Sequence, residues 1–328
     1  MTPTVTVVVP ARSDEPSLPV TLPAIVRSAR AVEVPTEVVV AVTLVPGAPL
    51  PTLTLDHDVR MVTAPELGKV AALGAAVGEA RGELLVLVDA DVLPTTTAFR
   101  LVLEPLLAGR ADDCGGRPRI SPRPGAGPVA SLLERWSTST LEAWHLLRTA
   151  HPGHLWALSG ALYALRRDLY PATVLAPLVD DVSIGLQALE AGGRFAYAPG
   201  AVVHVLAPTS YREWLRRKAR NYRNVAGLRR LRPAEVDGLE AAFRGCLRQV
   251  AAGGPANCLL RWQLRVLHLA ARASVRVSPV STRPWTPATS SKRWSVAQAR
   301  ALQDVGPLTG PSSSYATTTH RRPGRSHR

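Results

Sequence analysis

The feature that most constrains this chain is a run of five large aliphatic residues, Leu84–Val88, which stops at two aspartates. Such an uninterrupted run is typical of a strand buried on both faces in a parallel sheet. Asp89 and Asp91 follow with one residue between them, so in an extended chain their side chains point the same way. Ligands of open α/β sheets bind outside the carboxyl ends of the strands. Two oxygen ligands there suit Mg²⁺ or Mn²⁺, although aspartates are also common in solvated turns.

Strand-like and helical patterns alternate around this run. Residues Val5–Val9, Val38–Val42 and 60–63 are predicted strands, and residues 18–32 and 70–80 have helical spacing. The joins between them are short. This alternation predicts a doubly wound, mostly parallel α/β sheet with flanking helices.

The second half is less regular. Residues 112–128, rich in Gly, Pro and Arg, are predicted to form a loop, and 156–165 a strand or buried turn. Further helices are predicted over 132–147, 182–190 and 211–232, with a strand over 195–205 that Pro199 and Gly200 interrupt. Gly82 is predicted to cap the helix over 70–80.

The expected organisation has two halves of one domain and a C-terminal extension. An amphipathic helical pattern covers 239–277, of which 247–277 is cationic enough to lie on a bilayer. From Ser278 the chain lacks periodicity and is predicted to be a disordered tail. The predicted units are a donor-binding half (1–113), an acceptor half (114–232), a helical appendage (233–277) and the tail (278–328).

The composition favours a cytoplasmic protein with phosphate-bearing partners. The formal net charge is +14, and only three of the 39 basic residues are lysine. This charge favours nucleotides, nucleic acid or an anionic membrane face, although an arginine excess can also reflect a GC-rich coding sequence. The three cysteines show no CxxC spacing, which fits a reducing compartment, and no signal peptide or transmembrane helix is predicted.

Further charged residues complete a candidate site. Lys69 starts a helix, Asp180 and Asp181 start another, and an arginine-rich helix follows. Transfer of a sugar from a nucleoside diphosphate needs cations for the leaving diphosphate and a carboxylate that accepts the proton of the attacking hydroxyl. The sequence contains both kinds of group.

The order of motifs resembles that of family-2 glycosyltransferases with the GT-A fold. The similarity extends from about residue 5 to about residue 224. The segments that carry it are the opening strand and loop 7–15, the Gly-Lys helix start 68–73, the acidic strand end 87–91, the Ser-Gly stretch 159–167, the Asp-Asp helix start 180–185 and the Ala-Gly-Gly-Arg segment 191–194.

This resemblance implies roles for individual residues. Asp181 would be the general base, Asp89 would contact the nucleotide, and Asp91 would bind the metal together with Asp89. The remaining expected donor contacts are Pro10, Ala11, Glu15 and Lys69, and the expected diphosphate and acceptor contacts are Asp180, Arg217 and Arg220.

The chain departs from the family pattern at two places. Asn221 stands where the family has a tryptophan, which argues against processive polymer synthesis, and residues 40–43 lack the acids that usually hold the base. The sequence therefore does not predict which nucleobase the sugar donor carries.

Several candidate residues have a plainer interpretation. Asp180 and Asp181 are also good helix-capping residues, and Lys69 and Glu15 would be ordinary surface residues on a helix start and a loop. His204 follows a predicted strand and could bind the metal, but an ordinary hydrogen-bonded histidine at a strand end is the preferred interpretation.

The resulting prediction is a metal-dependent inverting glycosyltransferase that uses Mg²⁺ or Mn²⁺ and a nucleoside-diphosphate sugar. The acceptor is open, with a lipid or envelope glycan and peripheral contact with the inner face of the cell membrane as candidates. A sugar-phosphate nucleotidyltransferase is a competing hypothesis, but it would need glycines after the first strand, and residues 10–16 have none. A basic nucleic-acid- or membrane-binding protein, with nucleic acid disfavoured as a partner, and a non-catalytic scaffold also stay open.

Overall fold

The computed structural model describes residues 4–51, 53, 59–173, 178–250 and 293–303. Its strands are β1 Val5–Arg12, β2 Thr36–Thr43, β3 Val59–Ala64, β4 Leu84–Val88, β5 Leu93–Pro94, β6 Asp113–Ile120, β7 Leu162–Arg166 and β8 Phe195–Val205. Its α-helices are α1 Leu18–Arg30, α2 Lys69–Glu79, α3 Ala98–Leu107, α4 Pro128–Ala150, α5 Asp180–Glu190, α6 Tyr211–Leu231, α7 Pro233–Val250 and α9 Val296–Gln303. Two short 3₁₀ turns, η1 Leu155–Ala157 and η2 Arg167–Leu169, flank β7.

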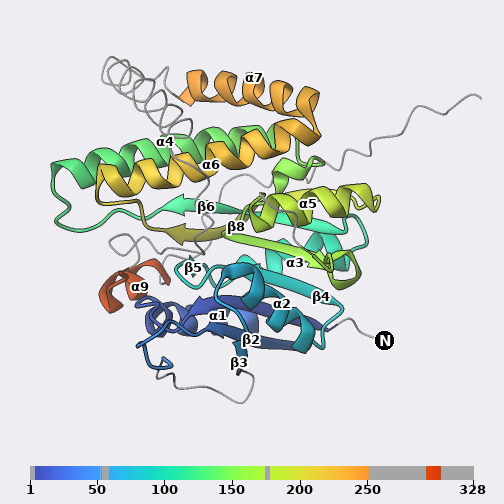
Figure 1. Ribbon diagram of the computed structural model, residues 1–328, viewed down its shortest axis with the longest axis vertical. Helices are drawn as coiled ribbons and strands as arrows, with labels where there is room; N and C mark the ends of the chain where they lie inside the picture. Colours follow the sequence, from blue (N-terminus) through green and yellow to red (C-terminus); the bar gives the residue numbers. More distant parts are fainter. Residues whose placement is uncertain (1–3, 52, 54–58, 174–177, 251–292, 304–328) are drawn as a thin grey trace, which may run out of the picture.

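The strands form one sheet in the order β3-β2-β1-β4-β7-β6-β8-β5 (Figure 1). The pairs β3-β2, β2-β1, β1-β4 and β6-β8 are parallel. Strand β7 is antiparallel to both β4 and β6, and the short β5 is antiparallel to β8. The predicted mixed α/β fold with a mostly parallel sheet is confirmed.

Both faces of the sheet are buried, which explains the aliphatic runs. Alternate residues of β1 belong to opposite cores: Val7 and Val9 pack in the core that contains helices α1 and α3, whereas Val8 packs in the core that contains α2. Strand β4 divides in the same way, with Val86 on the first face and Leu87 on the second. Side chains of a strand point alternately to its two faces, so both faces must be apolar.

The loop predicted over 112–128 is wrong over its first half, which forms β6, and α4 begins already at Pro128. The two glycines of β6 do not mark a turn. A Cβ atom at Gly115 would collide with the backbone carbonyl oxygen of Ala157, and one at Gly116 would lie 2.7 Å from the side chain of Leu162. Glycine is required here because the neighbouring chain approaches closely.

We expect Gly115→Ala to lower the free energy of unfolding by about 2–4 kcal/mol, because backbone must move to admit the methyl group. Gly74→Ala is the matched control: a Cβ at Gly74, in α2, meets nothing within 4 Å. This control should gain up to about 1 kcal/mol from helix propensity. Urea unfolding of both variants measures the difference, and a Gly115→Ala variant as stable as the wild type would contradict the packing described.

Two smaller predictions also need correction. Gly82 is not a helix cap: α2 ends at Glu79, and a Cβ at Gly82 would lie 2.5 Å from the backbone nitrogen of Thr6. Strand β8 continues through Pro199 and Gly200, although its pairing with β6 is irregular there, since Gly115 faces Tyr197 and Arg117 faces Val202. The proline and glycine therefore interrupt the regular pairing and leave the strand intact.

The C-terminal part differs from the prediction. Helices α4, α6 and α7 lie side by side as a layer over one end of the sheet (Figure 1). The predicted helix over 239–277 is seen up to Val250, and its remainder lies outside the described residues. The predicted tail from Ser278 is wrong over 293–303, which contains the ordered helix α9. In the described part of the chain, none of the helices combines the length and hydrophobicity needed to span a membrane.

Candidate active site

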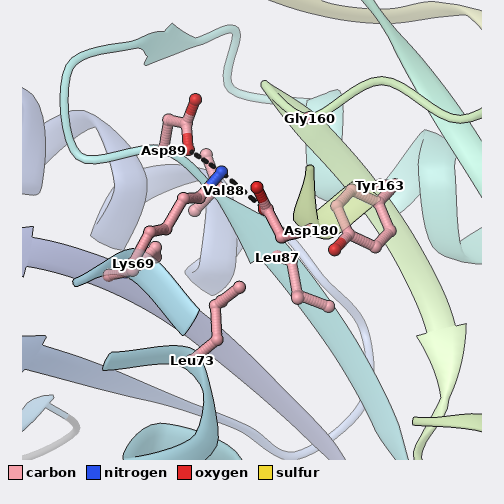
Figure 2. Close-up of a pocket in the computed structure, with 9 residues that line it drawn as sticks. Lys69, Leu73, Leu87, Val88, Asp89, Gly160, Tyr163 and Asp180 are labelled. Atoms are coloured by element: carbon pink, nitrogen blue, oxygen red, sulfur yellow. Dashed lines mark ion pairs between the residues drawn. The ribbon is translucent and has the colours of Figure 1, made fainter. Parts of the chain in front are cut away.

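Two consecutive elements, α2 and β4, meet the distant helix α5 at the carboxyl end of β4. Asp89 follows this strand, Lys69 is the first residue of α2, and Asp180 is the first residue of α5. The Lys69 Nζ atom lies 2.7 Å from Asp89 Oδ1 and 2.8 Å from Asp180 Oδ2. Figure 2 shows the lysine lying between the two carboxylates. The acidic end of β4 and the start of α5 therefore lie next to each other, with a lysine as the bridge.

Local backbone geometry directs these side chains into the site. Gly68 precedes α2 with φ 142°, a conformation that residues with side chains rarely adopt, and Lys69 follows directly. Asp180 and Asp181 both lie in the first turn of α5. Carboxylates there are stabilised by the helix dipole, so the capping interpretation and the site interpretation describe the same geometry.

The charges of the site are partly buried and lie within ion-pair distance of one another. Burial raises the pKa of Asp89, and nearby Asp91 and Asp180 raise it further, against the opposing effect of Lys69. Burial lowers the pKa of Lys69, but the charges of Asp180 and Asp89 outweigh it and raise the pKa above its usual value. Lys69 is therefore a permanent cation that partly neutralises a cluster of acids, and the plainer prediction of a solvated surface lysine is wrong.

Asp181 lies beside the Ser-Gly turn that precedes β7. Its Oδ1 atom accepts a hydrogen bond from the backbone N–H of Val182 at 2.9 Å. A Cβ at Gly160 would lie 2.9 Å from Asp181 Oδ2, so glycine leaves the space that this carboxylate occupies. Burial, and then the charge of Asp180, raise the pKa of Asp181. A carboxylate with a raised pKa is a stronger proton acceptor.

The turn beside Asp181 is held by a buried arginine that sequence reasoning did not single out. Arg148, on α4, donates from Nε to the carbonyl oxygen of Trp156 and from its guanidinium NH₂ to that of Leu158, both at 2.9 Å. Its charge also interacts with Asp181. Nothing in the sequence marks Arg148, because it is one of several arginines on amphipathic helices.

Two tyrosines were also missed. Tyr163, on β7, lines the pocket next to Asp180, and burial and the charge of Asp180 raise its pKa (Figure 2). Burial, then Asp180, raise the pKa of Tyr170 to about 12. Both therefore keep their protons and can donate hydrogen bonds. Tyr163 lies within the Ser-Gly stretch 159–167, which marks it as a candidate, whereas no motif in the sequence includes Tyr170.

The basic helix α6 brings one arginine close to the acids. Arg217 is near enough for its charge to interact with Asp91 and Asp89, although burial is the largest influence on its pKa and lowers it. Arg220 lies one turn further along α6 and is exposed. The expected cationic side of the site is thus represented by Arg217, with Arg220 at its edge.

The other predicted residues have mixed placements. Pro10 lines the pocket together with Lys69 and Asp89, whereas Ala11 is fully buried within β1. The plainer interpretation of Glu15 as a surface residue is wrong, because Glu15 is buried and accepts a hydrogen bond from the backbone N–H of Ser17. His204 lies on β8 opposite Leu93, and burial lowers its pKa to about 4, so it is neutral at ordinary pH.

The carboxylates fit a divalent cation in their chemistry. In the described ranges, no three or more His, Cys, Asp or Glu side chains form a ready-made metal cluster. However, Asp89 is destabilised by both Asp91 and Asp180, and a divalent cation would relieve this repulsion. Asp89 and Asp91 are therefore the residues that would hold a metal, and their oxygen atoms are ligands that Mg²⁺ and Mn²⁺ prefer.

Together, the doubly covered sheet, the acids at the end of β4 and the start of α5, and the flanking cations define a GT-A-like α/β protein with an acidic site at the edge of its sheet. Residues 3–224 match the profile of the family described as glycosyltransferase like family 2. The chain therefore belongs to this family of glycosyltransferases. No curated protein matches the sequence significantly.

Solved structures with a similar fold include several glycosyltransferases. The mannosyltransferase PcManGT from Pyrobaculum calidifontis, solved with GDP-Man and Mn²⁺, shares 19% identity over 92% of this chain and 86% of its own, with a TM-score of 0.48. Glucosyl-3-phosphoglycerate synthase from Mycobacterium tuberculosis, solved with Mn²⁺, UDP and phosphoglyceric acid, shares 20% identity over 61% and 68%, with a TM-score of 0.39. A further mycobacterial protein shares 22% identity over 62% of this chain, with a TM-score of 0.38, and this chain spans 65% of its length.

Proposed function

We propose that this protein is an inverting glycosyltransferase that moves a sugar from a nucleoside-diphosphate sugar to an acceptor hydroxyl with the help of a divalent metal ion. The observation that carries the proposal is the ion-paired group in which Lys69 bridges Asp89 and Asp180 at 2.7 and 2.8 Å. This group places the acidic strand end beside the start of α5, where Asp181 lies. Family membership supplies the class of reaction.

Asp181 is the proposed general base. Its carboxylate would take the proton from the acceptor hydroxyl as that oxygen attacks the anomeric carbon of the sugar. Burial and Asp180 raise the pKa of this carboxyl, so the basic form is lost when the pH falls through that raised value. The activity should therefore decline on the acid side at a pH above the ordinary aspartate pKa of about 4.

The cationic groups have a separate role. Lys69 and Arg217 would stabilise the negative charge that develops on the leaving diphosphate. Asp89 and Asp91 would hold the divalent ion, which when bound supplies further positive charge at the diphosphate. Pro10 would border the bound donor because it lines the same pocket.

The proposal also covers the class of acceptor and contact with a membrane. Arg212, Arg216 and Arg220 are exposed on α6, and this cationic row supports an anionic acceptor, such as a lipid-linked or envelope glycan, and contact with the inner face of a membrane. The cationic segment over 251–277 lies outside the described residues. Flotation with anionic liposomes at low salt tests the membrane contact, which fails if the protein does not co-float.

Donor binding tests the function directly. In a thermal-shift panel of UDP, GDP, ADP, CDP and dTDP with and without Mn²⁺, one base should raise Tm by several degrees only when the metal is present, because ligands that bind the native state stabilise it. Asp91→Asn should remove this metal-dependent shift. Asp168→Asn is the control, because Asp168 pairs with Arg166 on the surface. A shift that survives Asp91→Asn would contradict the metal assignment, and no shift with any nucleotide would contradict the function.

A further inference from the structure

A segment from the far end of the chain contacts the acidic loop of the site, which is formed by residues 89–92 between β4 and β5. Trp294 is 5% exposed, and its indole N–H donates a hydrogen bond of 2.9 Å to the backbone carbonyl oxygen of Asp91. The two residues are 203 positions apart. Helix α9, which begins just after Trp294, lies against α1 beside β5 (Figure 1).

Local interactions fix the orientation of Trp294. The side chain of Ser295 accepts a hydrogen bond from the backbone N–H of Gln298, and the side-chain oxygen of Gln298 accepts one from the backbone N–H of Ser295. This reciprocal pair is a helix capping box. Trp294 and Ala299, which flank the box at the positions of a hydrophobic staple, are buried in one cluster. The indole is therefore aimed by the start of α9.

The same cluster ties the segment to parts of the chain that lie next to the acidic loop or pack on α1. It contains Leu93, which follows the loop on β5, and Leu206, which follows β8. It also contains Ala24 of α1. Because the contacts come from three separate elements, α9 occupies a defined place against the domain.

The backbone of the acidic loop is held at each of its first three residues. The N–H of Asp89 donates to the carbonyl of Ala161 at 3.3 Å, and the carbonyl of Ala90 accepts from the Thr21 hydroxyl at 2.6 Å. The carbonyl of Asp91 accepts from Trp294. Two of these anchors come from elements of the main sheet domain, and the third comes from residue 294.

We propose that residues 293–303 are part of the catalytic unit and that Trp294 is a positioning residue, which holds the backbone of Asp91 so that its carboxylate is directed at the metal. This inference rests on the proposed function, because it assigns Trp294 a role in that same site. In this role Trp294 acts through the backbone of Asp91. The C-terminal segment thereby controls how tightly the site binds its metal and donor.

The test uses the full-length chain with Trp294→Phe, which keeps an aromatic ring and removes the N–H donor. Val296→Ala is the control, because Val296 is the first residue of α9, two positions after Trp294, and is 56% exposed. The Mn²⁺ concentration that gives half of the donor-induced thermal shift should rise about three- to tenfold in Trp294→Phe, as expected for one lost hydrogen bond. It should not change in Val296→Ala.

A second measurement does not depend on any ligand. Hydrogen–deuterium exchange of the peptide that covers residues 88–94 should be faster in Trp294→Phe than in the wild type and unchanged in Val296→Ala. Unchanged exchange would show that the contact does not hold the loop in solution. Faster exchange with an unchanged Mn²⁺ requirement would overturn the positioning role and leave a purely structural one. A wild-type protein that binds no nucleotide at all would instead overturn the proposed function, whatever the exchange result.

Discussion

Asp181→Asn is expected to lower kcat by about 10²–10⁴-fold, the contribution typical of a general base. The amide keeps the size of the carboxylate but cannot take a proton from the acceptor hydroxyl. Binding of the donor should stay within about threefold of the wild type, because the proposed metal and diphosphate contacts come from other residues. Rates of transfer and thermal shifts with the donor measure the two effects separately.

The pH profile provides an independent check on Asp181. In the wild type, activity should fall on the acid side as the carboxylate with the raised pKa is protonated. In Asp181→Asn the residual activity should lack this acid limb. Asp168→Asn, which changes an exposed aspartate in an ion pair with Arg166, should retain both kcat and the limb. Undiminished transfer by Asp181→Asn would show that another group is the base.

Lys69→Met is expected to lower the free energy of unfolding by about 2–4 kcal/mol at pH 7, as is typical when one partner of a buried ion pair is removed, with a discount for partial exposure. The lysine, Asp89 and Asp180 side chains are 17%, 31% and 14% exposed. Methionine fills similar space but leaves these two carboxylates close together without their cation. Equilibrium unfolding in urea measures the loss.

The sign of the pH effect follows from the charges. The native pKa of Lys69 is raised, so its stabilising contribution is complete at pH 7 and is lost only as the pH rises through that native value. In Lys69→Met the pKa of Asp89, which burial already raises and Lys69 opposes, should rise further, so the native state binds more protons than the unfolded chain. The destabilisation should therefore shrink as the pH falls from 7 towards 5.

Two variants serve as controls for this prediction. The double variant Lys69→Met/Asp180→Asn should recover part of the lost stability, because it removes one of the repelling charges. Arg110→Met removes a cation from an exposed pair with Glu104, in which the side chains are 40% and 42% exposed, and should cost no more than about 1 kcal/mol. If Lys69→Met were as mild as Arg110→Met, the bridging role of the lysine would be disproved.

The sequence was informative where one physical cause acts alone. The aliphatic run Leu84–Val88 predicts a strand because only a strand covered on both faces needs such a run, and β4 has the predicted bounds. The paired acids after β4 and at the start of α5 are visible because each follows from the end of its own element. Residues 293–303 carried a readable local signal as well, the Ser295–Gln298 capping box, although their overall composition favoured disorder.

The sequence was misleading where neighbouring segments decide the conformation. Gly115 and Gly116 indicate a loop when taken alone, but they belong to β6, because β7 and the turn before it pack closely against this strand. Likewise, Gly82 has the position of a helix cap and is instead required by its contact with β1. A glycine in the sequence does not reveal whether it serves backbone freedom or close packing.

By itself, then, the sequence determined the class of fold, the order of its first elements and the acids at the strand and helix ends, because period, burial and helix polarity are local properties of the chain. Only the tertiary structure decided that Lys69 bridges Asp89 and Asp180, that Arg148 holds the turn beside Asp181, and that Trp294 reaches the carbonyl of Asp91. These contacts join residues on different elements, from 8 to 203 positions apart along the chain, and their strength depends on burial and distance, which the packed molecule alone sets.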